Sequence, residues 1–202
     1  MAGLCVIGVT GASGAGKGAV CEILAGLGAY IIDTDKIAHE VILKGQPAYD
    51  EIINAFENDA ESFLNDLGEI ERRRLAGVVF GDEVKRKKLM EITHKYIVER
   101  SFDIVDKLQG APLQYRFIVI DAPLLIEAGM HVRCDWVIGV VADEDVRVGR
   151  IVSRDGLTPE EARLRVRKQT PIDVLMRYAD VVVENNGSVD ELKSKVHKID
   201  FI

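Results

Sequence analysis

Cysteine is scarce in this chain of 202 residues. The three cysteines, Cys5, Cys21 and Cys134, are widely spaced, and each lies in an apolar stretch. An odd and scattered set of this kind excludes a disulfide framework and a cysteine-based zinc site. We therefore expect buried thiols in a protein of a reducing compartment.

Long hydrophobic runs and a surplus of basic residues are also missing. No apolar run reaches the length of a membrane span, and the N-terminus enters a predicted strand without a basic segment. We therefore expect a soluble, cytoplasmic protein with no membrane partner. Lys and Arg number 26 against 33 Asp and Glu, which gives a net charge of −7. Proteins that bind nucleic-acid phosphates usually carry excess positive charge, so this balance argues against a nucleic-acid partner.

The segment 11–18 reads Gly-Ala-Ser-Gly-Ala-Gly-Lys-Gly, between an apolar run at 4–9 and a helical pattern at 17–27. A strand, a glycine-rich turn and a helix N-terminus in this order direct backbone amides and the helix dipole towards phosphate. The glycines permit positive φ angles and close approach of the backbone. Lys17 reaches the β- and γ-phosphates as a mobile cation. The predicted phosphate-binding residues are Gly11, Ser13, Gly14, Ala15, Gly16, Lys17, Gly18 and Ala19.

One position departs from the usual form of such a loop. The lysine is normally followed by Ser or Thr, whose hydroxyl binds Mg²⁺, but Gly18 and Ala19 supply no hydroxyl. Either the metal is held through waters and carboxylates, since Mg²⁺ needs few protein ligands, or nucleotide binding survives while phosphoryl transfer is weak. The acidic and basic residues further along the chain favour the first interpretation.

Four further apolar runs, at 30–32, 117–120, 136–141 and 181–183, have the continuous character of buried parallel strands. Helical patterns separate them, at 17–27, 35–44, 71–80, 83–107, 143–153, 158–168 and 188–197. This alternation predicts an α/β protein, a three-layer sandwich around a five-stranded parallel sheet. In such sheets ligands bind beyond the carboxyl ends of the strands.

Two segments interrupt the alternation of strand and helix. Residues 35–110 contain no convincing strand and are predicted to form a helical insert over the sheet, which leaves 1–34 and 111–202 as the core of a single domain. Residues 145–169 are predicted to form a lid of two short helices. Thr158 and Glu161 are spaced as a capping box at the start of the second lid helix.

Acidic residues follow the predicted strands. Asp33 is the first residue past the second strand, where a carboxylate can orient an acceptor hydroxyl and take its proton. Asp33 and Asp35 can also cap the helix that follows. We assign Asp35 to capping and Asp33 to catalysis. Asp121 ends the third strand, either as a cap or as a residue that holds Mg²⁺ directly or through water.

Arginines are concentrated in the predicted lid. Arg147, Arg150 and Arg154 share one helix face, and a similar group follows at 163–167. A single arginine of this kind is compatible with a solvated surface. The cluster as a whole fits a lid that closes over transferring phosphates and excludes water. Arg150 and Arg154 are the predicted catalytic arginines.

Other basic residues lie in the insert. Arg72 begins a run of three arginines that either binds phosphates of a second substrate or solvates a helix. His94 lies in a basic helical stretch and has either a structural or a binding role. Spacing alone does not choose between these alternatives.

The sequence resembles the dephospho-coenzyme A kinase family of P-loop kinases, which carry out the last step of coenzyme A biosynthesis. The similarity runs nearly end to end and in order. It is carried by the segments 8–17, 33–39, 68–75, 79–80, 92–94, 121–127, 150–157 with Gln169, and 179–187. Departures from the family pattern are Gly18, Ala19, Glu71 and Lys95.

The resemblance implies transfer of the γ-phosphate of ATP to the 3′-hydroxyl of dephospho-coenzyme A, with Mg²⁺ as cofactor. It implies that Asp33 is the base, that Lys17 and the loop bind phosphate, and that 145–169 is the lid. The implied substrate-binding residues are Asp33, Arg72, His94 and Leu124. The expected partners are the two small-molecule substrates, in a monomer or small homo-oligomer. A nucleoside monophosphate kinase, or a nucleotide-binding regulatory protein weakened in catalysis by Gly18, remains the alternative.

Overall fold

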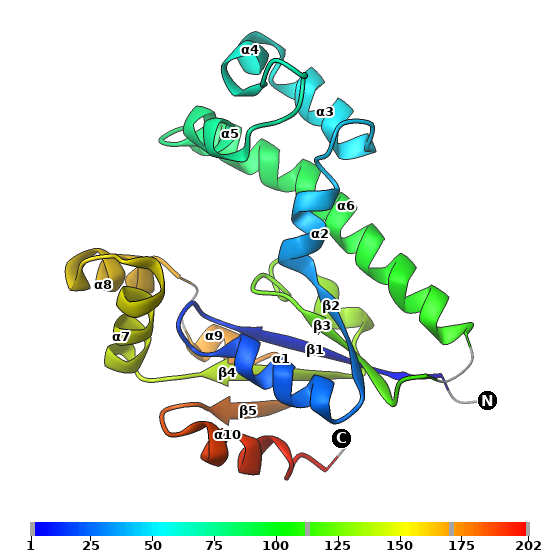
Figure 1. Cartoon of the computed structure of the whole chain (residues 1–202), viewed down its shortest axis with the longest axis vertical. Helices are drawn as coiled ribbons and strands as arrows, with labels where there is room; N and C mark the ends of the chain where they lie inside the picture. Colours follow the sequence, from blue (N-terminus) through cyan, green and yellow to red (C-terminus); the bar gives the residue numbers. More distant parts are fainter. Residues whose placement is uncertain (1–2, 112–113, 170–171, 201–202) are drawn as a thin grey trace. The chain divides into compact units, whose positions relative to one another are not determined.

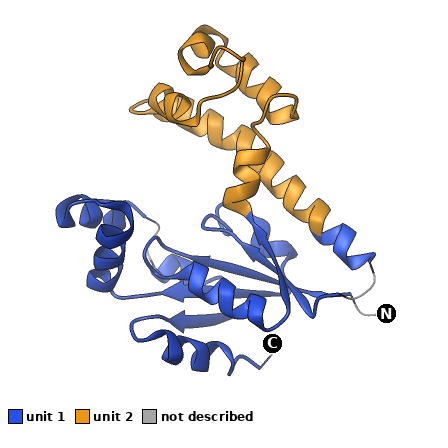
Figure 2. Cartoon of the chain, viewed as in Figure 1, with its two compact units in different colours: residues 1–33, 105–202 blue, residues 34–104 orange. Residues whose placement is uncertain are grey.

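The computed structural model describes residues 3–111, 114–169 and 172–200. The chain divides into two units, shown in Figure 2, one formed by residues 1–33 and 105–202 and the other by residues 34–104. The second unit overlaps residues 35–110, which we predicted to form a helical insert, and its C-terminal boundary lies inside a long helix. Pro112, expected in the turn that closes the insert, lies outside the described residues.

The first unit is built on a five-stranded parallel sheet, as predicted (Figure 1). The strands are β1 (Cys5–Gly11), β2 (Ala29–Asp33), β3 (Phe117–Asp121), β4 (Trp136–Val141) and β5 (Val181–Glu184), in the order β2-β3-β1-β4-β5. Because the strands are parallel, their carboxyl ends share one edge, where β1 runs into the glycine-rich loop. In the register of this edge, Asp121 of β3 pairs with Val9 of β1 and with Asp33 of β2.

Alternate residues of β1 face the two sides of the sheet. Ile7 and Val9 are fully buried on the side covered by α1 (Lys17–Gly26) and α10 (Val189–Val196), whose Leu24 and Leu192 belong to the same apolar core. The opposite side of the sheet is covered as well. Because both faces are covered, the strands appear in the sequence as continuous apolar runs. Figure 1 shows α1 lying along the sheet.

The opposite side of the sheet packs against less regular structure. A Cβ atom on Gly8 would lie 2.6 Å from Leu125, in the turns that follow β3, and one on Gly139 would lie 3.0 Å from Ala179. The short helices η2 (Met130–Arg133) and α9 (Ile172–Met176) also contact β1 and β4, respectively. Neither was predicted, because four or five residues are too few for a helical period to show in the sequence.

The two predicted lid helices are α7 (Glu144–Asp155) and α8 (Pro159–Arg167). Four of their side chains form a small core of their own: Val148, Ile151, Ala162 and Val166. The predicted capping box is present, since Thr158 accepts the backbone amide of Glu161 and the Glu161 side chain accepts the backbone amide of Thr158.

The second unit is helical. It contains α2 (Thr34–Glu40), α3 (Pro47–Ala55), η1 (Glu57–Asp59), α4 (Ala60–Phe63), α5 (Arg72–Val79) and most of α6 (Glu83–Gln109). The helix predicted at 35–44 ends earlier, and α3 was not predicted. Gly45, with φ of 88°, and Pro47 at the first position of α3 explain the break, because proline is favoured at a helix start.

Polar contacts link the helices of this unit. Lys85 of α6 forms an ion pair of 2.7 Å with Asp59 of η1. Glu51 of α3 accepts the Tyr96 hydroxyl at 2.6 Å and the Lys95 ammonium at 2.9 Å. These two hydrogen bonds hold the pKa of Glu51 below its usual range. Lys95, a departure from the family pattern, therefore contacts α3.

The longest helix, α6, has 27 residues and carries charged side chains along its length. Over residues 3–111, 114–169 and 172–200, no helix is both long enough and apolar enough to cross a bilayer.

Gly11 provides a test of how closely β1 and β4 approach at the carboxyl edge. A Cβ atom there would lie 2.6 Å from the backbone oxygen of Val140. We expect Gly11→Ala to lower the free energy of unfolding by about 1–3 kcal/mol, the usual cost of overpacking. Urea denaturation checks this. Gly149→Ala, where nothing lies within 4 Å, is the matched control and should not destabilise. Equal stability of the two variants would contradict the prediction.

Candidate active site

The glycine-rich loop owes its shape to two glycines with positive φ. Gly14 and Gly16 have φ of 81° and 92°, and the Ala15 amide closes a tight turn on the Ala12 carbonyl at 3.0 Å. Gly11 was grouped with these glycines as one that permits positive φ, but its φ is not positive. Its position is in β1, where the neighbouring backbone of Val140, not the dihedral angle, excludes a side chain.

The loop presents unbonded backbone amides. Within the described part of the chain, the amides of Gly14, Gly16, Lys17 and Gly18 have no protein acceptor. The first turn of α1 also contains no acidic side chain. Consecutive free amides at a helix N-terminus form an anion site, because partial positive charges converge there. The amides of Ala15 and Ala19 are used within the loop, and that of Ser13 donates to Gln169 at 3.1 Å.

The carbonyl groups of the loop are held from the opposite side. Arg147 Nε donates to the Ser13 oxygen at 3.1 Å, and Arg150 Nη1 donates to the oxygens of Gly14 and Ala15 at 3.2 and 3.3 Å. Asn185 Nδ2 donates to the same Ala15 oxygen at 2.9 Å. In a trans peptide the carbonyl and the following amide point in opposite directions. The bonds to Ser13 and Ala15 therefore turn the amides of the following residues away from the arginines.

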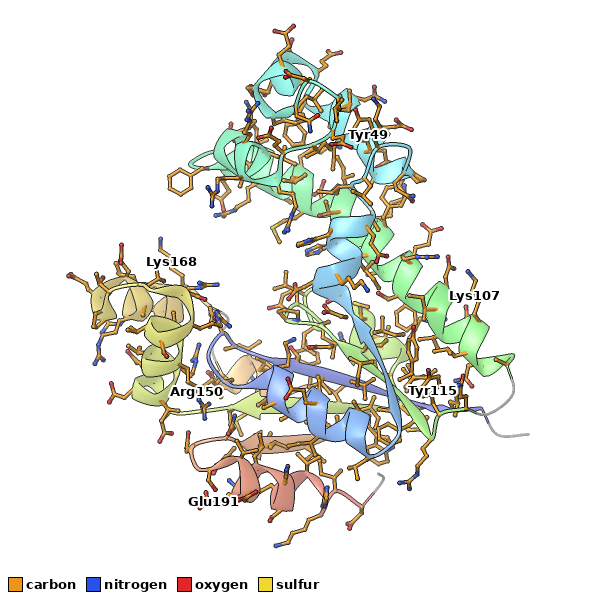
Figure 3. All side chains as sticks on the ribbon, in the orientation of Figure 1. Tyr49, Lys107, Tyr115, Arg150, Lys168 and Glu191 are labelled. Carbon is orange, nitrogen blue, oxygen red and sulfur yellow. The ribbon has the colours of Figure 1, made fainter. Side chains whose placement is uncertain are left out.

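This arrangement changes the interpretation of Arg150, which Figure 3 labels on α7. We predicted that it closes over phosphates, but it binds loop carbonyls and, at 3.3 Å, the side-chain oxygen of Asn185. Asn185 is buried beside the loop. Nothing in its sequence context distinguishes this role, because the contact joins residues 170 positions apart.

Arg154 lies closer to solvent than Arg147 or Arg150. Its side chain is 59% exposed, forms an ion pair of 2.7 Å with Asp155 and approaches the Ser13 hydroxyl at 3.4 Å. The Arg154 guanidinium holds the pKa of Asp155 below its usual range, and Arg165 adds to this effect. Arg163 pairs with Asp145 at 3.0 Å. Much of the arginine cluster is thus neutralised by acids of the same two helices.

Lys17 and Asp121 form an ion pair beside the loop, and each side chain is only 15% exposed. Asp33 ends the neighbouring strand and pairs in register with Asp121, so both carboxylates belong to the same face of the sheet. The helix α2 begins at Thr34, so Asp33 precedes it and Asp35 lies in its first turn. An N-cap residue comes immediately before the first residue of a helix. Asp35 is already inside α2, so its assignment as the cap is wrong.

The pKa of the Cys21 thiol depends on the charged side chains around it. Burial raises the pKa of its thiol, and the carboxylate of Asp121 raises it further, with a smaller contribution from Asp33. Lys17 acts in the opposite direction. Lys17, Asp121 and Asp33 therefore lie near one buried thiol at the carboxyl edge of the sheet. The three cysteines are free, as expected, although only Cys21 is fully buried.

The site offers carboxylates but no ready-made metal cluster. No group of three or more His, Cys, Asp or Glu residues in the described ranges is placed to hold a metal ion. Two carboxylates at adjacent strand ends are nevertheless sufficient for Mg²⁺, which keeps several of its waters. Gly18 contributes no ligand, and there is open space around it, since a Cβ atom added there would meet no other atom within 4 Å.

The residues predicted to bind the second substrate fall in different units. Leu124 belongs to the first unit, in the turns after β3, and is 42% exposed. Arg72 and His94 belong to the second. Arg72 begins α5, and its guanidinium contacts the ring of His39 in α2. His39 was not singled out from the sequence, although it lies in the 33–39 segment.

A parallel sheet with a central strand, this loop and a following helix, next to strand-end carboxylates, defines a P-loop kinase. The chain belongs to the dephospho-CoA kinase family, whose model matches residues 5–191. It is 37% identical to the dephospho-CoA kinase of Aquifex aeolicus over 193 residues, covering 96% of this chain and 94% of that protein. Identity to the dephospho-CoA kinase of Moorella thermoacetica is 39% over 191 residues, or 95% and 88% of the two chains.

Solved structures agree with this assignment. TT1252 from Thermus thermophilus superposes with a TM-score of 0.78 at 27% identity, covering 98% of this chain and 97% of that one. Dephospho-CoA kinase from Campylobacter jejuni gives a TM-score of 0.63 at 25% identity, with 96% and 94% covered. A shikimate kinase from Acinetobacter baumannii shares the fold, with a TM-score of 0.52 at 17% identity and coverage of 98% and 93%.

Proposed function

We propose that this chain transfers the γ-phosphoryl group of ATP to the 3′-hydroxyl of dephospho-coenzyme A, giving coenzyme A and ADP. Its membership of the dephospho-CoA kinase family supports the reaction. The observation that carries the mechanism is the set of free amides at Gly14, Gly16, Lys17 and Gly18, none of which has an acceptor in the described ranges. Together with the helix dipole, they form a site for a polyphosphate.

In this proposal the loop and Lys17 bind the β- and γ-phosphates. Lys17 is held by Asp121 in this structure, and binding of the nucleotide exchanges that partner for phosphate oxygens. Arg154 is the arginine proposed to reach the γ-phosphate, because it lies at the Ser13 hydroxyl and is largely exposed. A guanidinium there would stabilise the charge of the transition state. Arg150 is proposed to act through the loop that it supports.

Asp33 is the proposed base. Its strand ends beside that of Asp121, so its carboxylate is carried to the same edge as the phosphate loop. A carboxylate within hydrogen-bond reach of the acceptor hydroxyl orients it and accepts its proton as the oxygen attacks phosphorus. The role needs side-chain exposure, and Asp33 is exposed whereas the rest of β2 is largely covered.

Asp121 is the residue proposed to hold Mg²⁺, through water. When bound with the nucleotide, the ion neutralises phosphate charge. The Asp121 carboxylate is already paired with a cation, Lys17, which suits this purpose. The missing hydroxyl at Gly18 leaves more of the ion's coordination to water. Arg72, His94 and Leu124 are proposed to bind dephospho-coenzyme A, and the cytoplasm is the proposed location.

The reaction is tested by incubating the protein with ATP, Mg²⁺ and dephospho-coenzyme A and detecting the product by mass. We expect a gain of one phosphoryl group on the acceptor and formation of ADP in equal amount. A parallel panel of nucleoside monophosphates should give no product. Turnover on a monophosphate but not on dephospho-coenzyme A would reject the proposed substrate.

Removing the carboxylate charge at position 33 tests the base. We expect Asp33→Asn to lower kcat by about 10²–10⁴-fold, the usual contribution of general-base catalysis, and to leave ATP binding nearly unchanged. Steady-state kinetics and ATP titration measure the two effects separately. Asp35→Asn, two residues further on, should lower kcat by no more than about threefold, since no proton transfer is lost. Near-normal turnover of Asp33→Asn would remove the residue from this role.

A hydroxyl at position 18 tests how the metal is held. We expect Gly18→Ser to lower the Mg²⁺ concentration for half-maximal activity by a few-fold, roughly the value of one added oxygen ligand. Gly18→Ala is the matched control, because its methyl group enters the same open space without a ligand atom. Identical Mg²⁺ titrations for the two variants would show that the hydroxyl has no effect. Wild-type protein that binds ATP but forms no product in excess Mg²⁺ would support the regulatory alternative.

A further inference from the structure

Arg147 is an arginine in an unusual position. It lies on α7, is only 5% exposed, and has no carboxylate within ion-pair distance among the residues that the structure describes. Arginine is rarely buried without an acidic partner, because the charge loses its hydration. Burial accordingly lowers the pKa of the Arg147 guanidinium, and the more distant Glu144 opposes this effect. Burying this charge without a carboxylate partner costs free energy of folding. The two hydrogen bonds that Arg147 does form therefore indicate what the buried charge is used for.

Both partners belong to one closed ring of contacts. Arg147 Nε donates to the Ser13 carbonyl at 3.1 Å, and Nη2 donates to Gln169 Oε1 at 2.5 Å. The same Gln169 oxygen accepts the Ser13 amide at 3.1 Å. Ser13 is therefore held at both its backbone N–H and its backbone C=O. Arg147 and Gln169 lie before and after α8, so the ring joins the phosphate loop to both ends of this helical segment.

Backbone packing at the same place leaves little freedom. A Cβ atom on Gly14 would lie 2.6 Å from the backbone oxygen of Arg147, so the loop passes directly against α7. The Ser13 carbonyl points towards the arginine, and the Gly14 amide on the other side of that peptide bond points away from it. This amide is one of those with no acceptor in the described ranges.

We propose that Arg147 is a positioning residue for nucleotide binding, which sets the direction of the Gly14 amide through the Ser13 peptide and Gln169. It does not itself touch the phosphates. The inference rests on the proposed function only in taking the loop as the phosphate site.

The test compares Arg147→Gln and Gln169→Leu, singly and together. ATP affinity is measured by titration without acceptor, and the KM of each substrate by steady-state kinetics. We expect each single variant to weaken ATP binding about tenfold, the value of one hydrogen bond to a charged group. The KM for dephospho-coenzyme A should stay within about twofold, because its site is not part of the ring. The double variant should bind ATP about as weakly as one single variant, since either change opens the same ring.

Arg116→Gln is the matched control, because Arg116 also donates to a backbone carbonyl, that of Leu27 at 3.3 Å, but is exposed and precedes β3. It should leave ATP affinity unchanged. Unaltered ATP affinity in Arg147→Gln, or full multiplication of the single effects in the double variant, would overturn the proposal. If Arg147→Gln does not fold, Gln169→Leu decides, since Gln169 is only half-buried. Failure to phosphorylate dephospho-coenzyme A would reject the proposed function and leave the ATP titration interpretable.

Discussion

The direction of a few peptide groups in the 11–18 loop is the constraint on which this site depends. Backbone amides bind an anion only if several N–H groups point towards the same place. A flexible loop does not hold its peptide groups in this orientation. Here two glycines with positive φ permit the turn, and donors from α7 and from Asn185 hold the opposing carbonyls. Each of these bonds fixes an amide on the other side of the same peptide plane.

The charges of the site follow from this arrangement. Two arginines that the sequence places on one helix face lie behind the loop, and one lies at its solvent side. Those behind it have no ion-pair partner in the described ranges, whereas Arg154 is paired with Asp155. Lys17 is neutralised by Asp121. In the proposed reaction, a polyphosphate therefore meets the partial positive charge of fixed amides, while Lys17 and Arg154 must first exchange partners. Preorganised charge of this kind loses little energy to rearrangement when the ligand binds.

The adjacency of Asp33 and Asp121 has a simple origin in the sheet. Parallel strands end at one edge, and the order β2-β3-β1 places the ends of β2 and β3 side by side next to the loop after β1. The two carboxylates are 88 positions apart in the sequence, yet they are paired in register. The helices α2–α6, which separate them in the sequence, leave this register intact.

Local patterns were sufficient for much of the fold. The continuous apolar runs identified all five strands, because both faces of the sheet are covered, although the edge strands β2 and β5 are partly exposed. The Thr158 capping box followed from a spacing of three residues. The short helices η2 and α9 were not predicted, since four or five residues contain too few turns to show a period. The break after α2 depends on Gly45, whose φ angle is not visible in the sequence.

The sequence by itself determined that a strand, a phosphate loop and a helix follow one another, and that carboxylates end two neighbouring strands. Those features are local, and residue type and spacing encode them. Only the tertiary structure decided what the arginines of α7 contact and that Asn185 and Gln169 support the loop. These contacts join residues more than 130 positions apart, and a side chain's partner over such a distance depends on how the strands and helices pack.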